Sequence, residues 1–160
     1  MQNAHWLVWA RRVAALAQNG LTYCTDPFDE QRYSDLRTIA AEMMAAAAAV
    51  EAVPLLAAFQ MEEGYATPKI DIRSAVFDGD RVLLVKERSD GLWTPPDGWA
   101  DVGDSPSLAA VREVKEESGY DVAARKLAAV YDRDKHDHPK IQYHVYKFFF
   151  LCDLRGGAAA

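Results

Sequence analysis

Three closely spaced glutamates are the residues of this 160-residue chain that most clearly suggest chemistry. Glu113, Glu116 and Glu117 are three and four residues apart, so a helix would project all three carboxylates from one face. Like charges at that spacing cost an isolated helix roughly a few tenths of a kcal/mol per pair. A hard divalent cation such as Mg²⁺, which prefers oxygen ligands and bridges carboxylates to substrate phosphates, would remove this repulsion. The alternative is a solvated acidic face beside Arg112 and Lys115, because runs of charged residues usually only make a protein surface hydrophilic.

A helix is predicted to carry these glutamates. Ser105 followed by Pro106 is a typical helix start, with a side-chain cap and a proline in the first turn. Gly119 is a typical residue just beyond a helix end. The apolar residues expected to face inward are Leu108, Val111 and Val114.

The segments on either side of this helix alternate with a period of two, which predicts strands. The predicted strands cover residues 70–77, 82–85, 127–131 and 141–152. The first two should form a hairpin around the turn at 78–80. The last strand ends with apolar residues on both faces, so both faces of the sheet should be covered there. Residues 66–160 are therefore predicted to form a mixed α/β domain.

Residues 1–65 are predicted to form a separate, all-helical N-terminal domain. The apolar stripe of its first helix consists of Trp6, Trp9, Val13 and Leu16, and this helix should stop at Gly20. A second helix should start at Asp26 and Pro27, which supply a cap and a proline at the first position, and Pro54 should kink or end it. So small a helical domain cannot bury its apolar stripes alone. We expect it to pack on the second domain or on another copy of itself.

Composition and charge exclude several classes of protein. A chain that is 50% hydrophobic and 26% charged is that of a globular protein with a core. The net charge of −6 argues against nucleic acid as a partner. No apolar run approaches the roughly 20 residues that span a bilayer, and the first residues lack a leader pattern, so we predict a cytoplasmic protein with no membrane partner. Cys24 and Cys152 are expected to be reduced.

The spacing around the glutamates resembles a known motif. It runs Gly98, five residues, Asp104, seven residues, Arg112-Glu113-Val114, one residue, Glu116-Glu117, one residue, Gly119-Tyr120. This resembles the Nudix box of the Nudix hydrolases, which has Glu where this chain has Asp104. The segments around the box and the helical N-terminal part resemble the branch that acts on nucleoside diphosphates linked to another group. The resemblance implies an α/β fold, a Nudix-type α/β/α sandwich around a mixed sheet, preceded by a small all-helical domain.

The resemblance also implies an activity, namely hydrolysis of the pyrophosphate bond in a small nucleotide of the ADP-ribose or CDP-choline type. The products would be a nucleoside monophosphate and a second phosphorylated compound. Glu113, Glu116 and Glu117 would hold Mg²⁺ or Mn²⁺ against the diphosphate, and Arg112 would pair with Asp104 to brace the loop on the helix. The alternatives are a nucleoside triphosphate pyrophosphohydrolase and, in another class, a catalytically weak nucleotide-binding regulatory module. A homodimer formed through the N-terminal domain is expected.

Two further features depart from the family pattern. Asp97 stands where the family usually has glycine, and we interpret it as a solvent-facing turn residue; the alternative is that it adds an acid to the site. The chain stops at residues 156–160, where family members continue with another strand and a helix, so we expect the C-terminal part to be truncated. A catalytic base that some Nudix enzymes take from a later loop would then be absent, and the base is not assigned.

Three residues outside the glutamate set are predicted to bind substrate. Arg88 follows the second strand and is a candidate for a phosphate contact, with plain solvent exposure as the alternative. Gly98 opens the box. His136 lies in the charged loop 132–140, which we interpret as a loop near the substrate. Because this loop also holds His138 and two aspartates, a transition-metal site is an alternative, and so is a solvated connection.

Overall fold

The computed structural model describes residues 3–138 and 141–159. The chain divides into two compact units. The helical unit comprises Met1–Pro68 and His138–His144, and the sheet unit comprises Lys69–Asp137 and Val145–Ala160. Residues 139 and 140 of the predicted loop lie outside the described residues.

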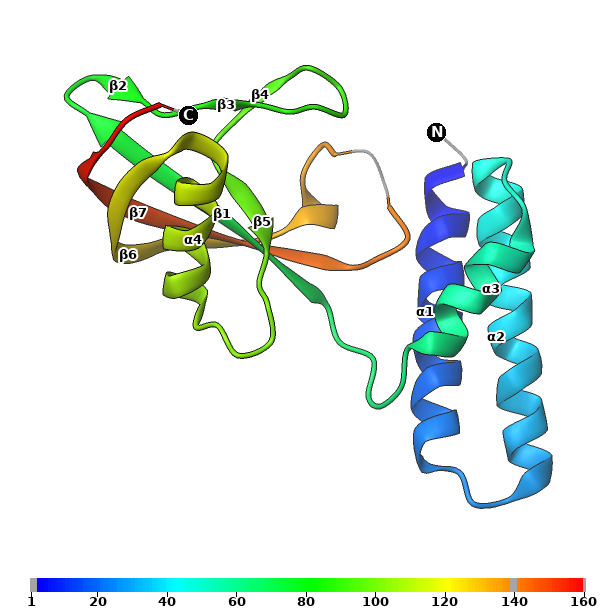
Figure 1. The fold of residues 1–160 in the computed structure, drawn as a ribbon. Coiled ribbons are helices and arrows are strands. Elements are labelled where there is room, and N and C mark those ends of the chain that lie inside the picture. The colour runs from blue at the N-terminus through cyan, green and yellow to red at the C-terminus, as the bar shows by residue number, and fades with distance from the viewer. Residues whose placement is uncertain (1–2, 139–140, 160) are drawn as a thin grey trace. The chain divides into compact units, whose positions relative to one another are not determined.

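The described residues of the helical unit form three helices, α1 (Asn3–Tyr23), α2 (Pro27–Ala48) and α3 (Ala52–Met61) (Figure 1). Helix α2 starts as the sequence predicts, because the Asp26 carboxylate accepts hydrogen bonds from two backbone N–H groups of the first turn. It ends at Ala48, and Ala49 follows in the left-handed conformation. Pro54 lies in the first turn of α3, where its missing N–H leaves no helical hydrogen bond unmade, so it neither kinks nor ends α2.

Helix α1 does not stop at Gly20, contrary to the sequence prediction. It continues to Tyr23, with Gly20 inside it. The reason lies in α2, because a Cβ added to Gly20 would overlap the ring of Tyr33. This glycine therefore serves close packing of the two helices rather than helix termination.

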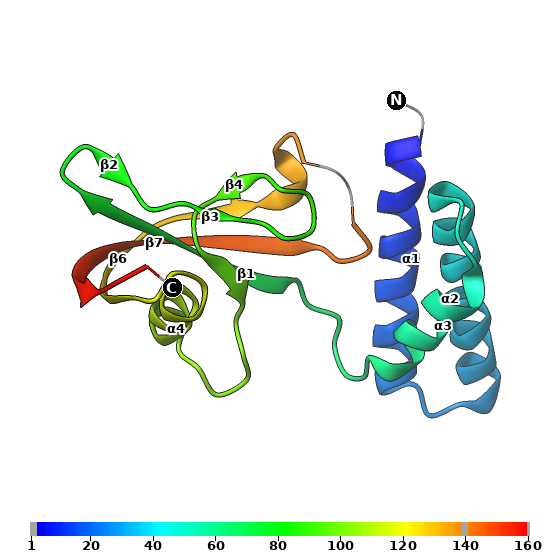
Figure 2. The same cartoon turned by 45° about the horizontal axis from the view of Figure 1, so that its top comes forward.

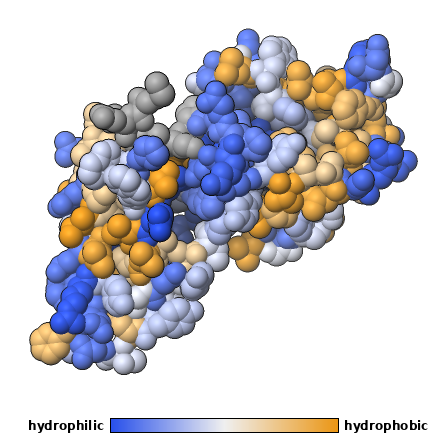
Figure 3. Space-filling view, turned by 180° about the vertical axis from the view of Figure 1, so that it is seen from behind, coloured by the Kyte–Doolittle hydropathy of each residue, from blue (hydrophilic) through white to orange (hydrophobic). Residues whose placement is uncertain are grey.

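The buried surface of the helical unit is built from small residues rather than from the predicted stripe. Its buried side chains include Ala10 and Ala17 of α1 and Ala40, Ala41, Met44 and Ala45 of α2. In the predicted stripe Trp6 is 50% exposed and Leu16 is 65% exposed. The space-filling view also shows hydrophobic residues at the surface of this unit (Figure 3). The two helices contact each other through alanines, which allow a close approach. The larger apolar side chains lie at the surface of the unit.

The sheet unit contains a five-stranded mixed sheet and one long helix. The strands are β1 (Lys69–Asp78), β2 (Arg81–Val82), β5 (Asp97–Trp99), β6 (Tyr120–Asp132) and β7 (Val145–Gly157). Their order is β2-β1-β7-β6, with β5 also paired to β1, and β1 runs parallel to β7. A separate pair, β3 (Val85–Lys86) with β4 (Trp93–Thr94), and the short 3-10 helix η1 (Arg133–Lys135) complete the unit. Figure 2 shows α4 (Pro106–Ser118) lying against one face of the sheet.

The core of the sheet unit lies between α4 and the sheet. Its buried residues are Ile72, Val76, Ala109, Ala110, Val114, Val122, Phe150 and Cys152. Ser74 Oγ also donates a hydrogen bond to the Ala110 carbonyl at 3.1 Å, which joins the helix to β1. Leu108 was predicted to face inward but is 60% exposed, because α4 packs through Ala109 and Ala110 instead.

The predicted hairpin is only partly formed. Residues 81–82 pair with the end of β1 across the turn, but the chain then leaves the sheet, and Val85–Lys86 pairs with Trp93–Thr94. The sixth strand starts at Tyr120, directly after α4, and is much longer than the predicted 127–131. Of the helices within the described residues, none combines the length and the apolar character needed to cross a membrane.

Substitution of Gly20 tests the close packing of α1 on α2. Gly20→Val should destabilise the protein by about 1–3 kcal/mol, because the added side chain overlaps the Tyr33 ring. Thr22→Val introduces the same residue at an exposed position of the same helix and should change the free energy of unfolding by less than about 0.5 kcal/mol. Urea unfolding followed by circular dichroism measures both, and equal effects would contradict the packing role of Gly20.

Candidate active site

Helix α4 places the three glutamates in its last turns. The Ser105 hydroxyl accepts a hydrogen bond from the Leu108 N–H at the start of the helix. Gly119 ends it with a positive φ of 78°. The predicted helix is therefore confirmed together with both of its signals.

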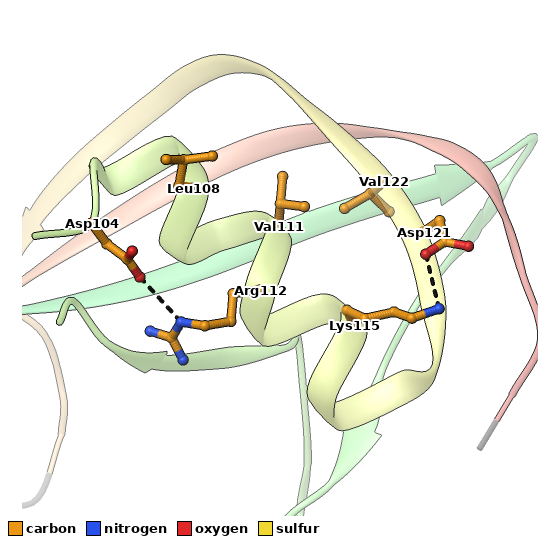
Figure 4. Close-up of a pocket in the computed structure, with 7 residues that line it drawn as sticks. All are labelled: Asp104, Leu108, Val111, Arg112, Lys115, Asp121 and Val122. Atoms are coloured by element: carbon orange, nitrogen blue, oxygen red, sulfur yellow. Dashed lines mark hydrogen bonds and ion pairs between the residues drawn. The ribbon is translucent and has the colours of Figure 1, made fainter.

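The Arg112 guanidinium joins this helix to the loop before it. Its Nε donates to Asp104 Oδ2 at 3.1 Å, as Figure 4 shows, and its Nη2 lies 3.2 Å from Asp101 Oδ2. Its Nη1 contacts Glu113 Oε1 at 2.7 Å and Glu116 Oε2 at 3.3 Å. The hydrogen bond to Asp104, together with the neighbouring acids, raises the pKa of Arg112. The shorter acid at 104 thus still makes a direct ion pair with Arg112.

Glu113 is the buried member of the glutamate set, with 8% of the residue exposed. Its carboxylate lies against Gly98, because a Cβ added there would overlap it. Burial raises the pKa of Glu113, and Arg112 partly opposes this shift. The structure therefore places Gly98, a predicted substrate-binding residue, directly beside one of the glutamates.

Glu117 is held from the other side, by a strand. Its Oε2 accepts a hydrogen bond from the backbone N–H of Asp97, at 2.9 Å. Burial raises the pKa of Glu117, while this hydrogen bond lowers it. Glu116 and Glu117 are both exposed, with 59% of the Glu116 side chain open to solvent.

Asp97 is not the solvent-facing turn residue that we predicted. It belongs to β5, only 14% of its side chain is exposed, and its Oδ1 lies 2.8 Å from Arg73 Nη1. Among the described residues Ala49 is the one non-glycine residue with positive φ, so Asp97 needs no glycine-like backbone. Burial raises the pKa of Asp97 to about 7, and the Arg73 cation only partly offsets it. In the sequence, Asp71 and Arg73 alternate with apolar residues, so both charges lie on one face of an otherwise apolar strand. This pattern could have identified Arg73 as the partner of Asp97.

The other predicted substrate residues lie on different segments. Arg88 is in the exposed turn between β3 and β4. His136 follows η1, is exposed, and has its ring centroid 4.8 Å from that of Tyr131. The geometry thus joins Gly98 to the glutamates, and substrate contacts by Arg88 and His136 stay predictions.

The donor set of α4 suits a hard divalent cation. Arg112 engages one oxygen each of Glu113 and Glu116, and the Asp97 N–H engages one oxygen of Glu117. Each carboxylate therefore has a second oxygen that these contacts do not use. Mutual repulsion among the glutamates contributes to the raised pKa values of Glu113 and Glu117, and a cation would relieve it. An all-oxygen set fits Mg²⁺ or Mn²⁺ better than it fits a soft metal.

A second feature, a hollow of about 420 Å³, lies between α4 and the start of β6. Figure 4 shows its apolar residues, Leu108, Val111 and Val122, between the ion pairs Arg112–Asp104 and Lys115–Asp121. The exposed Leu108 is thus part of this hollow and not of the core.

Comparison with known proteins assigns both parts of the chain to one family. Residues 4–59 match the family described as "UDP-X-like, N-terminal oligomerisation domain", and residues 67–160 match the NUDIX domain. The chain therefore belongs to the Nudix hydrolases, and the predicted Nudix fold and enzyme class are confirmed. Within that family it carries the helical N-terminal domain of the UDP-X-like branch.

Individual relatives extend this result. A Bacillus subtilis (strain 168) protein named "Putative ADP-ribose pyrophosphatase YjhB" is 44% identical over 95% of this chain and 73% of its own length. The crystal structure of a UDP-X diphosphatase aligns over 100% of this chain and 78% of its own, with 31% identity and a TM-score of 0.55. An ADP-ribose pyrophosphatase from Streptococcus suis 89-1591 is 47% identical over 59% of this chain and 66% of its own, with a TM-score of 0.53.

Substitution of Gly98 tests whether this residue leaves room for the Glu113 carboxylate. In Gly98→Ala the methyl group would overlap that carboxylate, so we expect hydrolytic activity to fall by at least about tenfold. Gly156→Ala is the matched control, because a Cβ there meets no atom within 4 Å. Initial rates of nucleotide hydrolysis, measured beside thermal midpoints, separate loss of the site from loss of the fold. Unchanged activity in Gly98→Ala would contradict the close approach.

Proposed function

We propose that this chain hydrolyses the pyrophosphate bond of a nucleoside diphosphate linked to another group, in a reaction that depends on a divalent metal. The observation that carries the proposal is the convergence of three carboxylates of α4, each with an oxygen that Arg112 and the Asp97 N–H do not use. Diphosphates bind hard cations through oxygen, so such a cation would bridge this carboxylate set to the bond that breaks.

The proposed metal ligands are Glu113, Glu116 and Glu117, with Mg²⁺ or Mn²⁺ as the ion. When bound, such an ion neutralises phosphate charge and lowers the pKa of a coordinated water. Arg112 orients Glu113 and Glu116 through Nη1 and favours the ionised form of Glu113. Gly98 keeps space for the Glu113 carboxylate. The protein thus contributes the negative charge and the positions of the metal-binding carboxylates, and the reaction needs no covalent nucleophile.

The names of the relatives support a linked diphosphate as substrate. Two of them are named as ADP-ribose pyrophosphatases and one as a UDP-X diphosphatase. We therefore propose ADP-ribose or a related nucleoside diphosphate as the substrate, with a nucleoside monophosphate and a phosphorylated compound as products. CDP-choline belongs to the same chemical class and stays a candidate.

We also propose that the helical unit forms a homodimer. Its matching family is described as an oligomerisation domain. On α2 the large apolar residues Phe28, Leu36 and Ile39 are exposed, and Phe28 and Ile39 lie on the side of the helix away from the buried alanines. A stripe of this kind on a charged protein is typical of a contact surface. A second copy of this chain is its proposed occupant.

Substitution of one glutamate tests the metal role. Glu116→Gln should lower the turnover of the best substrate by about 100-fold or more at unchanged thermal midpoint, because the side chain is exposed and only its charge is lost. Glu42→Gln, an exposed position on α2, makes the same chemical change away from the site and should leave the rate unchanged.

The assay is monophosphate release with Mg²⁺ from ADP-ribose, CDP-choline, a UDP-linked sugar and dGTP. Release from a linked diphosphate in preference to dGTP is the expected result. Preference for dGTP would favour a triphosphate pyrophosphohydrolase. Nucleotide binding without release from any of the four would favour a regulatory module.

Charge introduced into the apolar stripe of α2 tests the dimer. Ile39→Glu should convert a dimer to a monomer, because burial of an unpaired carboxylate in an apolar interface is costly. Gln31→Glu adds the same charge at an exposed position of α2 outside the apolar stripe, so it should leave the dimer intact. Light scattering coupled to size-exclusion chromatography gives the mass of each. A monomeric wild type, or a dimeric Ile39→Glu variant, would count against this surface.

A further inference from the structure

Asp97 makes two contacts that point in opposite directions. Its backbone N–H donates to Glu117 Oε2 at 2.9 Å, toward the glutamate set. Its side-chain Oδ1 lies 2.8 Å from Arg73 Nη1, toward strand β1. The two residues are register partners of the antiparallel pair β1–β5. Asp97 is therefore a link between the sheet and one of the proposed metal ligands.

The Arg73 guanidinium is itself fixed by two further side chains, Asp71 and Thr94. Its Nε and Nη2 donate to Asp71 Oδ2 at 3.3 and 3.1 Å, on the same strand. Its Nη1 donates to Thr94 Oγ1 at 2.7 Å, on β4. Only 15% of its side chain is exposed, and Lys147 Nζ lies 3.6 Å from the same Asp71 oxygen. Two acidic and two basic side chains are thus gathered in a largely buried group.

Buried charges at these distances hold one another in place. A partly buried ion pair is screened less by solvent than a surface pair, and loss of one partner leaves the other uncompensated. Because Asp71 and Thr94 fix Arg73, the ion pair to Arg73 in turn fixes Asp97 on the sheet. The direction of the Asp97 N–H, and with it the hydrogen bond to Glu117, follows from this arrangement.

Glu117 needs such a fixed donor. Two neighbouring acids, Glu87 and Glu116, repel its carboxylate, and the Arg73 cation attracts it. Groups that hydrogen-bond a metal-binding carboxylate set its orientation, and their loss typically costs about 10–100-fold in metal affinity or activity. A glycine at position 97 would keep the N–H but lose the link to Arg73.

We propose that Asp97 is a positioning residue, which uses its buried ion pair to Arg73 to hold its own backbone N–H on Glu117 and so orients this carboxylate for the metal. This inference rests on the proposed metal role of the glutamates. It gives the departure from the family's glycine a function, because the acid at 97 replaces backbone freedom with a fixed donor.

The test measures binding of Mn²⁺ alone to the full chain by isothermal titration calorimetry, with thermal midpoints recorded beside it. Asp97→Ala removes the link to Arg73 and should raise the Kd for Mn²⁺ about tenfold. Asp97→Asn keeps the size of the side chain but removes the charge that pairs with Arg73, so it too should raise the Kd for Mn²⁺. If Asp97→Ala does not fold, Asp97→Gly removes the same link and carries the same expectation.

Two control variants separate the possible results. Asp78→Ala removes an aspartate that pairs with Arg81 at the exposed end of β1, away from the glutamates, so it should leave Mn²⁺ binding unchanged. Glu117→Gln removes the charge of the ligand itself and should weaken Mn²⁺ binding.

Each remaining outcome overturns a defined statement. Normal Mn²⁺ binding in Asp97→Ala beside weakened binding in Glu117→Gln overturns the positioning role and leaves the metal site standing. A loss in Asp78→Ala as large as that in Asp97→Ala, or normal binding in both Asp97→Ala and Asp97→Asn, also overturns the positioning role. Normal binding in Glu117→Gln overturns the assignment of Glu117 to the metal and with it the basis of the inference.

Discussion

The central interaction of the candidate active site is the set of contacts made by the Arg112 guanidinium. Two of its neighbours, Glu113 and Glu116, are on its own helix, and two others, Asp101 and Asp104, are on the loop that leads into that helix. Three or more acids gathered within a few ångströms would repel one another and splay apart without a cation among them. Arg112 supplies that cation from the protein, so the carboxylates keep their arrangement before any metal binds.

Strand β5 provides the opposite wall of the same site. Gly98 approaches Glu113 so closely that no side chain fits between them, and Asp97 reaches Glu117 through its N–H. Because β5 pairs with β1, both contacts are tied to the core of the sheet rather than to a loose loop. The site therefore has one wall from a helix and one from a strand. The buried Glu113 is contacted by both, by Arg112 on the helix and by Gly98 on the strand, whereas the exposed Glu117 is held by Asp97 on the strand.

The helical unit is packed differently from the sheet unit. Its helices meet through alanines and through Gly20, which lies against the Tyr33 ring, so the interior is thin and the large apolar residues stay outside. A single chain gains little stability from such residues in water, whereas two chains that bury them against each other gain about 25 cal/mol per Å². The family description of this part as an oligomerisation domain agrees with that distribution.

The sequence alone determined the features that follow from local rules. The cap at Ser105, the stop at Gly119 and the spacing of the glutamates all act within one helix, so their pattern predicted both α4 and the shared face of the carboxylates. Only the tertiary structure decided what each side chain faces. Asp97 was interpreted as exposed because its partner Arg73 lies 24 residues earlier on another strand, and Gly20 was interpreted as a helix end because Tyr33 lies on the next helix. Periodicity records which residues share a face, but it does not specify the partner on the other side, and burial and pKa depend on that partner.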